Sequence, residues 1–201
     1  MGREIIGLIE NINSIVPTWN ILGFLDDNEF YWGQQINGYM VHGGKDWLQN
    51  IKADIYLTCG IGVSAARKSF YNSIIQYPKV ILATLVDPTA SINKTVKIGV
   101  GSVICRNSTI NIDSIIGNGV LLNTGASVGH DAVIGDFCTL ITSSMVSGST
   151  LIGECCEIGS GAFVLQGKKI TNNCTIAPLT AVLKNIDEAG LYSGNPARRF
   201  K

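Results

Sequence analysis

The sequence predicts two units: a small α/β unit with a parallel sheet over residues 1–87, followed by an all-β, parallel β-helix with a C-terminal cap over residues 88–201. In the first unit, helix and strand patterns alternate. In the second, an aliphatic residue recurs every six positions. Of fifteen aromatic residues only Phe137 and Phe163 lie between residues 91 and 181, which indicates a narrow core there. We place the boundary at Asp87-Pro88, because proline biases the preceding residue away from helix.

The composition excludes several classes of protein. With 46% hydrophobic and 15% charged residues, the 201-residue chain can bury a core and is not disordered. Fifteen basic and fifteen acidic residues cancel, so no net field attracts nucleic acid or an acidic membrane. The apolar run at 80–86 is far shorter than the roughly 20 residues that span a bilayer. With no secretion signal and six cysteines without a CxxC pair, we expect a reduced, cytoplasmic protein.

The first unit shows two periodicities. Its expected elements are a helix over 5–16, a strand over 21–25, a strand over 54–58, a helix from Ser64 and a strand over 79–86. Strands alternating with helices predict a Rossmann-like parallel sheet. Such units normally open with a strand and a Gly-rich turn, whereas this pattern opens in a helix. We therefore expect the first strand to be absent from the sheet and a ligand site there to be weakened.

The second unit repeats every six residues. Every sixth position from Ile92 to Val182 is Ile, Leu or Val, sixteen positions without exception. Glycine often follows the aliphatic residue, as at Gly99 and Gly117, where we expect a tight corner. This repeat is typical of a β-helix whose aliphatic residues point into a triangular prism. Residues 92–181 would form five coils of 18 residues, about 24 Å tall.

Three cysteines follow the same period. Cys138, Cys156 and Cys174 are 18 residues apart, so they should stack in successive coils. A redox or metal role is conceivable, but we favour small residues that fill a tight corner.

Five segments then carry a resemblance to a known family: Gly23 to Asp27, Gly60 to Gly62, Val86 to Ala90, Asn123 to Asp131 and Gly194 to Ala197. The chain resembles the hexapeptide-repeat acyltransferases, whose prisms are left-handed β-helices, an exception to the right-handed crossover rule. More narrowly, its whole length is similar to the sugar O- and N-acetyltransferases that include sialic-acid O-acetyltransferases and UDP-amino-sugar N-acetyltransferases. The hexapeptide signal is the most specific part of this resemblance.

His130 is the candidate general base. It lies two residues after Val128, which places it near a side or corner of the prism and pointing outward. Acyl transfer needs a base that takes the proton of the acceptor during attack, and imidazole exchanges protons near neutral pH. The resemblance implies this role for His130, and it implies that Asp131 increases the basicity of the ring. The other histidine, His42, is expected in a loop with a structural role.

Two further residues complete the expected catalytic set. The resemblance implies that the Asn123 amide orients the acceptor. Gly148 lies 18 residues after His130, on the same side one coil along, and the resemblance gives its N–H the oxyanion contact. No serine or cysteine forms an obvious triad with His130, so we expect direct attack without an acyl-enzyme.

The resemblance also implies a donor, an assembly and an acceptor site. Acetyl-CoA would lie along the prism between subunits of a homotrimer, near Thr139, Ser160 and Pro178. Trimerisation would cover the outward apolar residues Leu121, Val133 and Met145. Asp26 and Asp27 follow a strand, at the edge where parallel sheets bind ligands. The resemblance implies that they contact the nucleotide of a UDP-sugar, with Gly62 nearby, although Val63 replaces the Asn of many relatives.

These expectations imply an enzyme that transfers an acetyl group from acetyl-CoA to an amino group of a nucleotide-activated sugar, for surface-glycan synthesis. Two alternatives stay open: O-acetylation of sialic acid or a related sugar, and a non-catalytic sugar-nucleotide-binding module. A zinc lyase on a similar prism would need three histidine ligands, and only His130 lies in the repeat, so we set it aside and expect no metal. We expect no nucleic-acid partner and no membrane insertion.

Overall fold

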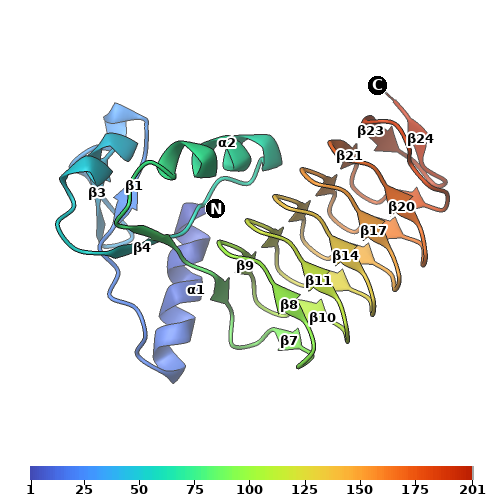
Figure 1. The fold of residues 1–201 in the computed structure, drawn as a ribbon, viewed down its shortest axis with the longest axis horizontal. Coiled ribbons are helices and arrows are strands. Elements are labelled where there is room, and N and C mark those ends of the chain that lie inside the picture. The colour runs from blue at the N-terminus through green and yellow to red at the C-terminus, as the bar shows by residue number, and fades with distance from the viewer. Residues whose placement is uncertain (201) are drawn as a thin grey trace.

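The computed structural model describes residues 1–200. It consists of a small unit of helices and short strands followed by a stack of three-sided coils (Figure 1). None of its helices is both long and apolar enough to cross a bilayer. The predicted fold class, an α/β unit followed by a left-handed parallel β-helix, is confirmed.

The N-terminal unit has the following elements: α1 (Gly2–Ile15), β1 (Phe24–Leu25), the 3₁₀ helix η1 (Glu29–Tyr31), β2 (Gln35–Ile36), β3 (Tyr39–Gly43), the 3₁₀ helix η2 (Lys45–Asn50), β4 (Ile55–Leu57), α2 (Ser64–Ile74) and β5 (Val80–Leu82). β1 pairs with β3 in parallel, β2 pairs with β3 in antiparallel, and β4 pairs with β5 in parallel. The expected single sheet is therefore divided into two small sheets. His42 lies on β3 and not in a loop, because Tyr39–Gly43 pairs with both β1 and β2.

The prism has three faces. Face 1 contains β7 (Ser91–Ile92), β10 (Thr109–Ile110), β13 (Ser127–Val128), β16 (Met145–Val146), β19 (Phe163–Val164) and β22 (Ala181–Val182). Face 2 contains β8 (Lys97–Ile98), β11 (Ile115–Ile116), β14 (Val133–Ile134), β17 (Leu151–Ile152) and β20 (Lys169–Ile170). Face 3 contains β6 (Leu85–Val86), β9 (Val103–Ile104), β12 (Leu121–Leu122), β15 (Thr139–Leu140), β18 (Glu157–Ile158), β21 (Cys174–Ile176), β23 (Gly190–Ser193) and β24 (Arg198–Arg199). Paired strands within the coils are parallel and offset by 18 residues, as with Ser127 opposite Met145.

The prism begins at β6 (Leu85–Val86), before the expected start of the six-residue repeat at Ile92. The expected strand over 79–86 is two strands, β5 and β6, and β6 pairs with β9 on face 3. The boundary between the units at residue 87 stays a prediction.

The six-residue repeat forms the core. Fourteen of its sixteen aliphatic positions are buried, and only Ile92 and Ile98 in the first coil are half-buried. Buried hydroxyls and thiols join the coils at the corners: Ser114 Oγ donates to the Gly129 carbonyl at 2.6 Å, and Cys138 Sγ donates to the Gly153 carbonyl at 2.9 Å. Cys138, Cys156 and Cys174 are all free and buried, as the corner-filling interpretation predicted.

The glycines after the aliphatic positions have a different physical reason from the expected one. Their backbone is not in the left-handed region. A Cβ on Gly99 would instead lie 2.4 Å from the backbone of Gly117 in the next coil. Close stacking of the coils, and not the turn itself, therefore requires glycine at these positions.

The N-terminal unit covers face 3. Ile5 and Leu8 of α1 pack against Val103 and Leu121, so Leu121 is only 2% exposed and is already covered within the chain. Of the three outward residues expected in a trimer contact, Met145 remains exposed and Val133 half-buried.

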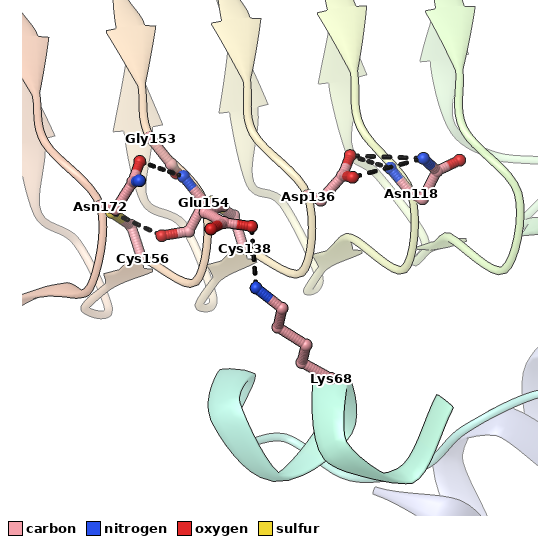
Figure 2. Close-up of polar contacts among 8 residues, drawn as sticks. All are labelled: Lys68, Asn118, Asp136, Cys138, Gly153, Glu154, Cys156 and Asn172. Carbon is pink, nitrogen blue, oxygen red and sulfur yellow. Dashed lines mark hydrogen bonds and ion pairs between the residues drawn. The ribbon is translucent and has the colours of Figure 1, made fainter. Parts of the chain in front are cut away.

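α2 is fixed to the corner between faces 2 and 3. Arg67 is 2% exposed and has no carboxylate partner among residues 1–200. It donates to the Gly119, Phe137 and Cys138 carbonyls of the prism and to the Ile61 and Gly62 carbonyls before α2. Figure 2 shows the neighbouring Lys68 reaching from α2 to Glu154, with Nζ 2.9 Å from Oε2. At the same corner, the Asp136 carboxylate accepts from the Asn118 N–H of the preceding coil.

Candidate active site

His130 lies at the corner between faces 1 and 2. It belongs to the turn that joins β13 to β14, and its side chain is 49% exposed. Its Nδ1 lies 2.7 Å from Oδ2 of Asp131. When Nδ1 carries the proton and donates it to this carboxylate, the Nε2 lone pair is left free to act as a base. The carboxylate would also stabilise the imidazolium that forms on protonation.

The backbone of Asp131 holds this pair in place. Asp131 has φ = 56°, in the left-handed region that Asp tolerates better than most residues. Its N–H donates to the Ile112 carbonyl of the preceding coil, and the His130 carbonyl accepts from Ser149 N–H of the following coil. The hydrogen-bonded pair of His130 and Asp131 is therefore carried by a turn bonded to the coil on each side.

Gly148 lies beneath the imidazole. A Cβ added to Gly148 would be 2.5 Å from Nε2 and 2.7 Å from Cε1 of His130, so only glycine leaves room for the ring in this position. The Gly148 carbonyl accepts from Gly167 N–H at 3.0 Å. Its own N–H donates no hydrogen bond within residues 1–200. The structure thus brings His130, Asp131 and Gly148 together, as the 18-residue spacing predicted.

The other predicted residues of the prism lie elsewhere. Asn123 is half-buried at the corner between faces 3 and 1, and strand β13 separates it from His130. Ser160 and Pro178 lie at that same corner, two and three coils further along. A single chain therefore presents two groups of predicted residues, one at each edge of face 1.

Thr139 faces the N-terminal unit. It is 3% exposed, its hydroxyl donates to the Gly62 carbonyl at 2.9 Å, and it accepts from Arg67 Nη2 at 2.8 Å. This burial argues against our prediction that Thr139 contacts CoA. Gly62 is bound from two sides, because its carbonyl also accepts from Arg67 Nη1 at 3.0 Å.

Asp26 and Asp27 lie at the mouth of a cavity of ≈ 750 Å³ in the N-terminal unit. Both are exposed and follow β1 directly. The cavity lining includes Gly60 and Ile61, and Gly62, which we expected near this crevice, is the next residue, just outside the lining. The reason is that the Gly62 carbonyl is bound by Arg67 and Thr139.

His42 lines the same cavity and was not predicted as a site residue. Its Nε2 lies 2.9 Å from the Leu22 carbonyl, and its ring stacks on Trp47 with centroids 4.8 Å apart. Lys45 lies at the same rim, where its N–H donates weakly to Asp27 Oδ1 at 3.4 Å. Sequence reasoning missed these residues because the pairing of β3 with β1 is not visible in any local pattern. Within residues 1–200 no group of three or more His, Cys, Asp or Glu side chains could hold a metal ion.

Comparison with known proteins bears on both units. Residues 1–74 match the PglD N-terminal domain family. No curated protein matches the chain. Three solved structures are similar over nearly the whole chain. The acetyltransferase domain of PglB from Neisseria gonorrhoeae FA1090, also solved with acetyl coenzyme A, is 27% identical with a TM-score of 0.86, covering 96% of this chain and 94% of its own.

The other two structures have similar scores. PerB from Caulobacter crescentus, in complex with CoA and GDP-perosamine, is 25% identical with a TM-score of 0.87, covering 98% of this chain and 93% of its own. WeeI from Acinetobacter baumannii AYE is 25% identical with a TM-score of 0.89, covering 99% of this chain and 94% of its own.

The fold and these comparisons together indicate the class: a hexapeptide-repeat sugar acetyltransferase. The resemblance predicted from the sequence is confirmed. Within that class, the chain is similar over nearly its whole length to the acetyltransferase domain of PglB, to PerB and to WeeI.

Proposed function

We propose that this protein transfers the acetyl group of acetyl-CoA to an amino group of a nucleotide-activated sugar, with His130 as the general base. The observation that carries the proposal is the 2.7 Å contact between His130 and Asp131 above Gly148. Acetyl-CoA as the donor is supported by the PglB domain and by PerB, which hold acetyl coenzyme A and CoA. A nucleotide-linked acceptor is supported by the GDP-perosamine in PerB.

The chemistry follows from the position of the free Nε2. The acceptor nitrogen attacks the thioester carbonyl, and Nε2 takes a proton from that nitrogen as the C–N bond forms. The Asp131 carboxylate stabilises the resulting imidazolium through Nδ1–H. The N–H of Gly148 is our candidate donor to the developing oxyanion. The tetrahedral intermediate then collapses, the C–S bond breaks, and the CoA thiolate takes the proton from the imidazolium.

The assembly we propose is a homotrimer. Face 3 is covered by the N-terminal unit, whereas faces 1 and 2, which flank His130, expose apolar side chains such as Met145 (49%), Ile115 (42%) and Leu151 (40%). Burying them between copies would be favourable. It would also allow the corner with Asn123, Ser160 and Pro178 to meet the His130 corner of a neighbour. The acceptor cavity near Asp26 and Asp27 lies on the side of face 3, so we assign it to a neighbouring copy as well.

A thiol-release assay tests the proposal. The purified protein is given acetyl-CoA with each of several UDP- and GDP-linked amino sugars and with sialic acid, and free CoA is measured with a thiol reagent. We expect release with at least one nucleotide-linked amino sugar and loss of that release in His130→Ala. Release with sialic acid alone would favour O-acetylation. Binding of a sugar nucleotide without release would favour the non-catalytic module.

The six free cysteines fit the reducing, cytoplasmic environment in which we place this reaction.

A further inference from the structure

The corner that carries His130 presents one residue per coil at the same place in its turn. The strand pairings on face 1 align six aliphatic residues: Ile92, Ile110, Val128, Val146, Val164 and Val182. The residues two places after them therefore lie on one line along the prism: Lys94, Ile112, His130, Gly148, Gln166 and Lys184. At about 4.8 Å per coil, Lys94 is about 10 Å from His130 toward the N-terminal end, and Lys184 is about 14 Å away toward the other end. The base thus has one lysine on each side of it along this corner.

Lys94 is an exposed cation without a partner. It lies in the turn that joins β7 to β8, and no ion pair within residues 1–200 includes it. Its neighbours Asn93 and Thr95 are uncharged. In the next coil, Asp113 N–H donates to the Thr95 hydroxyl at 2.9 Å, but its carboxylate forms no ion pair with Lys94. An ammonium group on a flexible stem is a common phosphate ligand, so Lys94 is available to an anion that reaches this corner.

The cavity of the N-terminal unit stands at the height of Lys94. Its lining includes Leu85 of β6, and β6 pairs with β9 at the N-terminal end of face 3. Lys94 follows β7, the next strand along the chain, whereas His130 lies two coils further along. Figure 1 shows the N-terminal unit beside this end of the stack. A nucleotide in the cavity therefore lies near the level of Lys94, and the group attached to it approaches His130 from the N-terminal side.

The cavity and His130 of one chain are on opposite sides of the prism. The N-terminal unit covers face 3, and the His130 corner is the one where faces 1 and 2 meet. In the homotrimer proposed above, a three-fold axis along the prisms keeps equal coils of the copies at equal height. The cavity of one copy would then face the stretch from Lys94 to His130 of its neighbour.

We propose that Lys94 binds the diphosphate of the nucleotide-linked acceptor that a neighbouring copy holds in its N-terminal cavity. This inference rests on the proposed function and names a specificity residue for it. The sugar ring lies along Ile112, whose side chain is 47% exposed and apolar, and the amino group of the sugar reaches Nε2 of His130. Lys94 thereby distinguishes an acceptor linked to a diphosphate from a free amino sugar, and each acceptor site takes residues from two copies.

Nucleotide binding without any acetyl donor tests this assignment. Calorimetry gives the Kd of UDP and of GDP for the wild type, Lys94→Gln and Lys94→Arg. We expect the tighter of the two nucleotides to bind roughly tenfold more weakly to Lys94→Gln, because one charge-assisted contact is lost, and to bind Lys94→Arg about as tightly as the wild type. Lys184→Gln is the matched control, at the same place in the turn beyond His130, and should leave Kd unchanged. Equal Kd values for the wild type and Lys94→Gln would overturn the proposal, as would an equal loss in Lys184→Gln.

A second comparison shows which copy supplies the lysine. Met145→Glu combined with Leu151→Glu is designed to separate the copies, so it should weaken nucleotide binding about as much as Lys94→Gln does. Adding Lys94→Gln to this variant should then change Kd no further, and a further tenfold loss would overturn the assignment to a neighbouring copy. Thiol release together with a Kd that ignores Lys94 would refute this inference alone. Nucleotide binding that needs Lys94, without thiol release, would refute the proposed acetyl transfer alone.

Discussion

Nδ1 of His130 lies 2.7 Å from Oδ2 of Asp131, and the ring rests directly above the Cα of Gly148. Two consecutive residues thus place an imidazole against a carboxylate, and a glycine from the next coil leaves space for the ring.

Replacing the carboxylate should slow the reaction without unfolding the protein. In Asp131→Asn we expect kcat to fall roughly tenfold to a hundredfold, because the imidazolium loses its charged partner. Asp113→Asn is the matched control, since Asp113 holds the same place one coil earlier with φ = 58° and has no histidine beside it. Steady-state kinetics measure kcat for both variants. Equal kcat values for the two would contradict the role of Asp131.

Filling the space beneath the ring should move the base. Gly148→Ala places a methyl group 2.5 Å from Nε2, so the half-exposed imidazole must swing away. We expect kcat to fall by about tenfold or more with a change in Tm of only a few degrees. Gly7→Ala, where a Cβ meets nothing within 4 Å, serves as the control and should keep full activity. A Gly148→Ala enzyme with the kcat of the wild type would show that catalysis does not depend on the observed position of the His130 ring.

The exposed apolar side chains on faces 1 and 2 should hold copies together. We expect Met145→Glu combined with Leu151→Glu to convert the proposed trimer to a monomer and to abolish thiol release, because the His130 corner and the Asn123 corner of neighbouring copies then no longer meet. Ile75→Glu, on the N-terminal unit and 77% exposed, is the control. Sedimentation velocity measures the assembly. A wild-type protein that sediments as a monomer, yet is active, would contradict the proposal that the active site forms between copies.

The buried Arg67 should matter for stability more than for chemistry. In Arg67→Met the carbonyls of Gly119, Phe137 and Cys138 lose their donor, and we expect the free energy of unfolding to fall by roughly 3 kcal/mol. Chemical denaturation provides the measurement. The control Lys68→Met removes only a partly exposed ion pair and should change stability by less than about 1 kcal/mol. Similar losses in both variants would contradict the special role of Arg67.

Asp87 should make stability depend on pH in the acid range. Burial alone would raise its pKa, but hydrogen bonds from the Thr89 N–H and hydroxyl and from Asn11 outweigh this and hold the pKa below its ordinary value of 3.8. A carboxyl with a lowered pKa adds stability above its unfolded pKa and loses it as pH falls through the folded value. The difference in unfolding free energy between wild type and Asp87→Asn should therefore shrink below about pH 4. A difference that is constant from neutral to acid pH would contradict this assignment.

The periodic part of the fold could be predicted from the sequence, since one residue in six must fill a narrow core and the repeat fixes the register. The same period correctly placed Gly148 beside His130. The six-residue period does not predict that Thr139 is buried against Arg67, because that contact joins segments more than 70 residues apart. Likewise no local sequence pattern identifies Tyr39–Gly43, which carries His42, as a strand. It becomes a strand because it pairs with β1 and β2 in the folded chain.

Asn123 shows the limit of spacing arguments. Seven residues separate it from His130 in the sequence, but a hexapeptide fills one face, so the two side chains lie at different corners. Whether they share one site depends on a second copy of the chain, which no pattern within one sequence determines.

The most direct measurement is the rate of CoA release by His130→Ala, with acetyl-CoA and the nucleotide-linked amino sugar that the wild-type enzyme prefers. We predict a fall in kcat of roughly a hundredfold or more, the scale of a lost general base, with an unchanged Tm. Turnover equal to that of the wild type in the folded variant would contradict the assignment of His130 as the base.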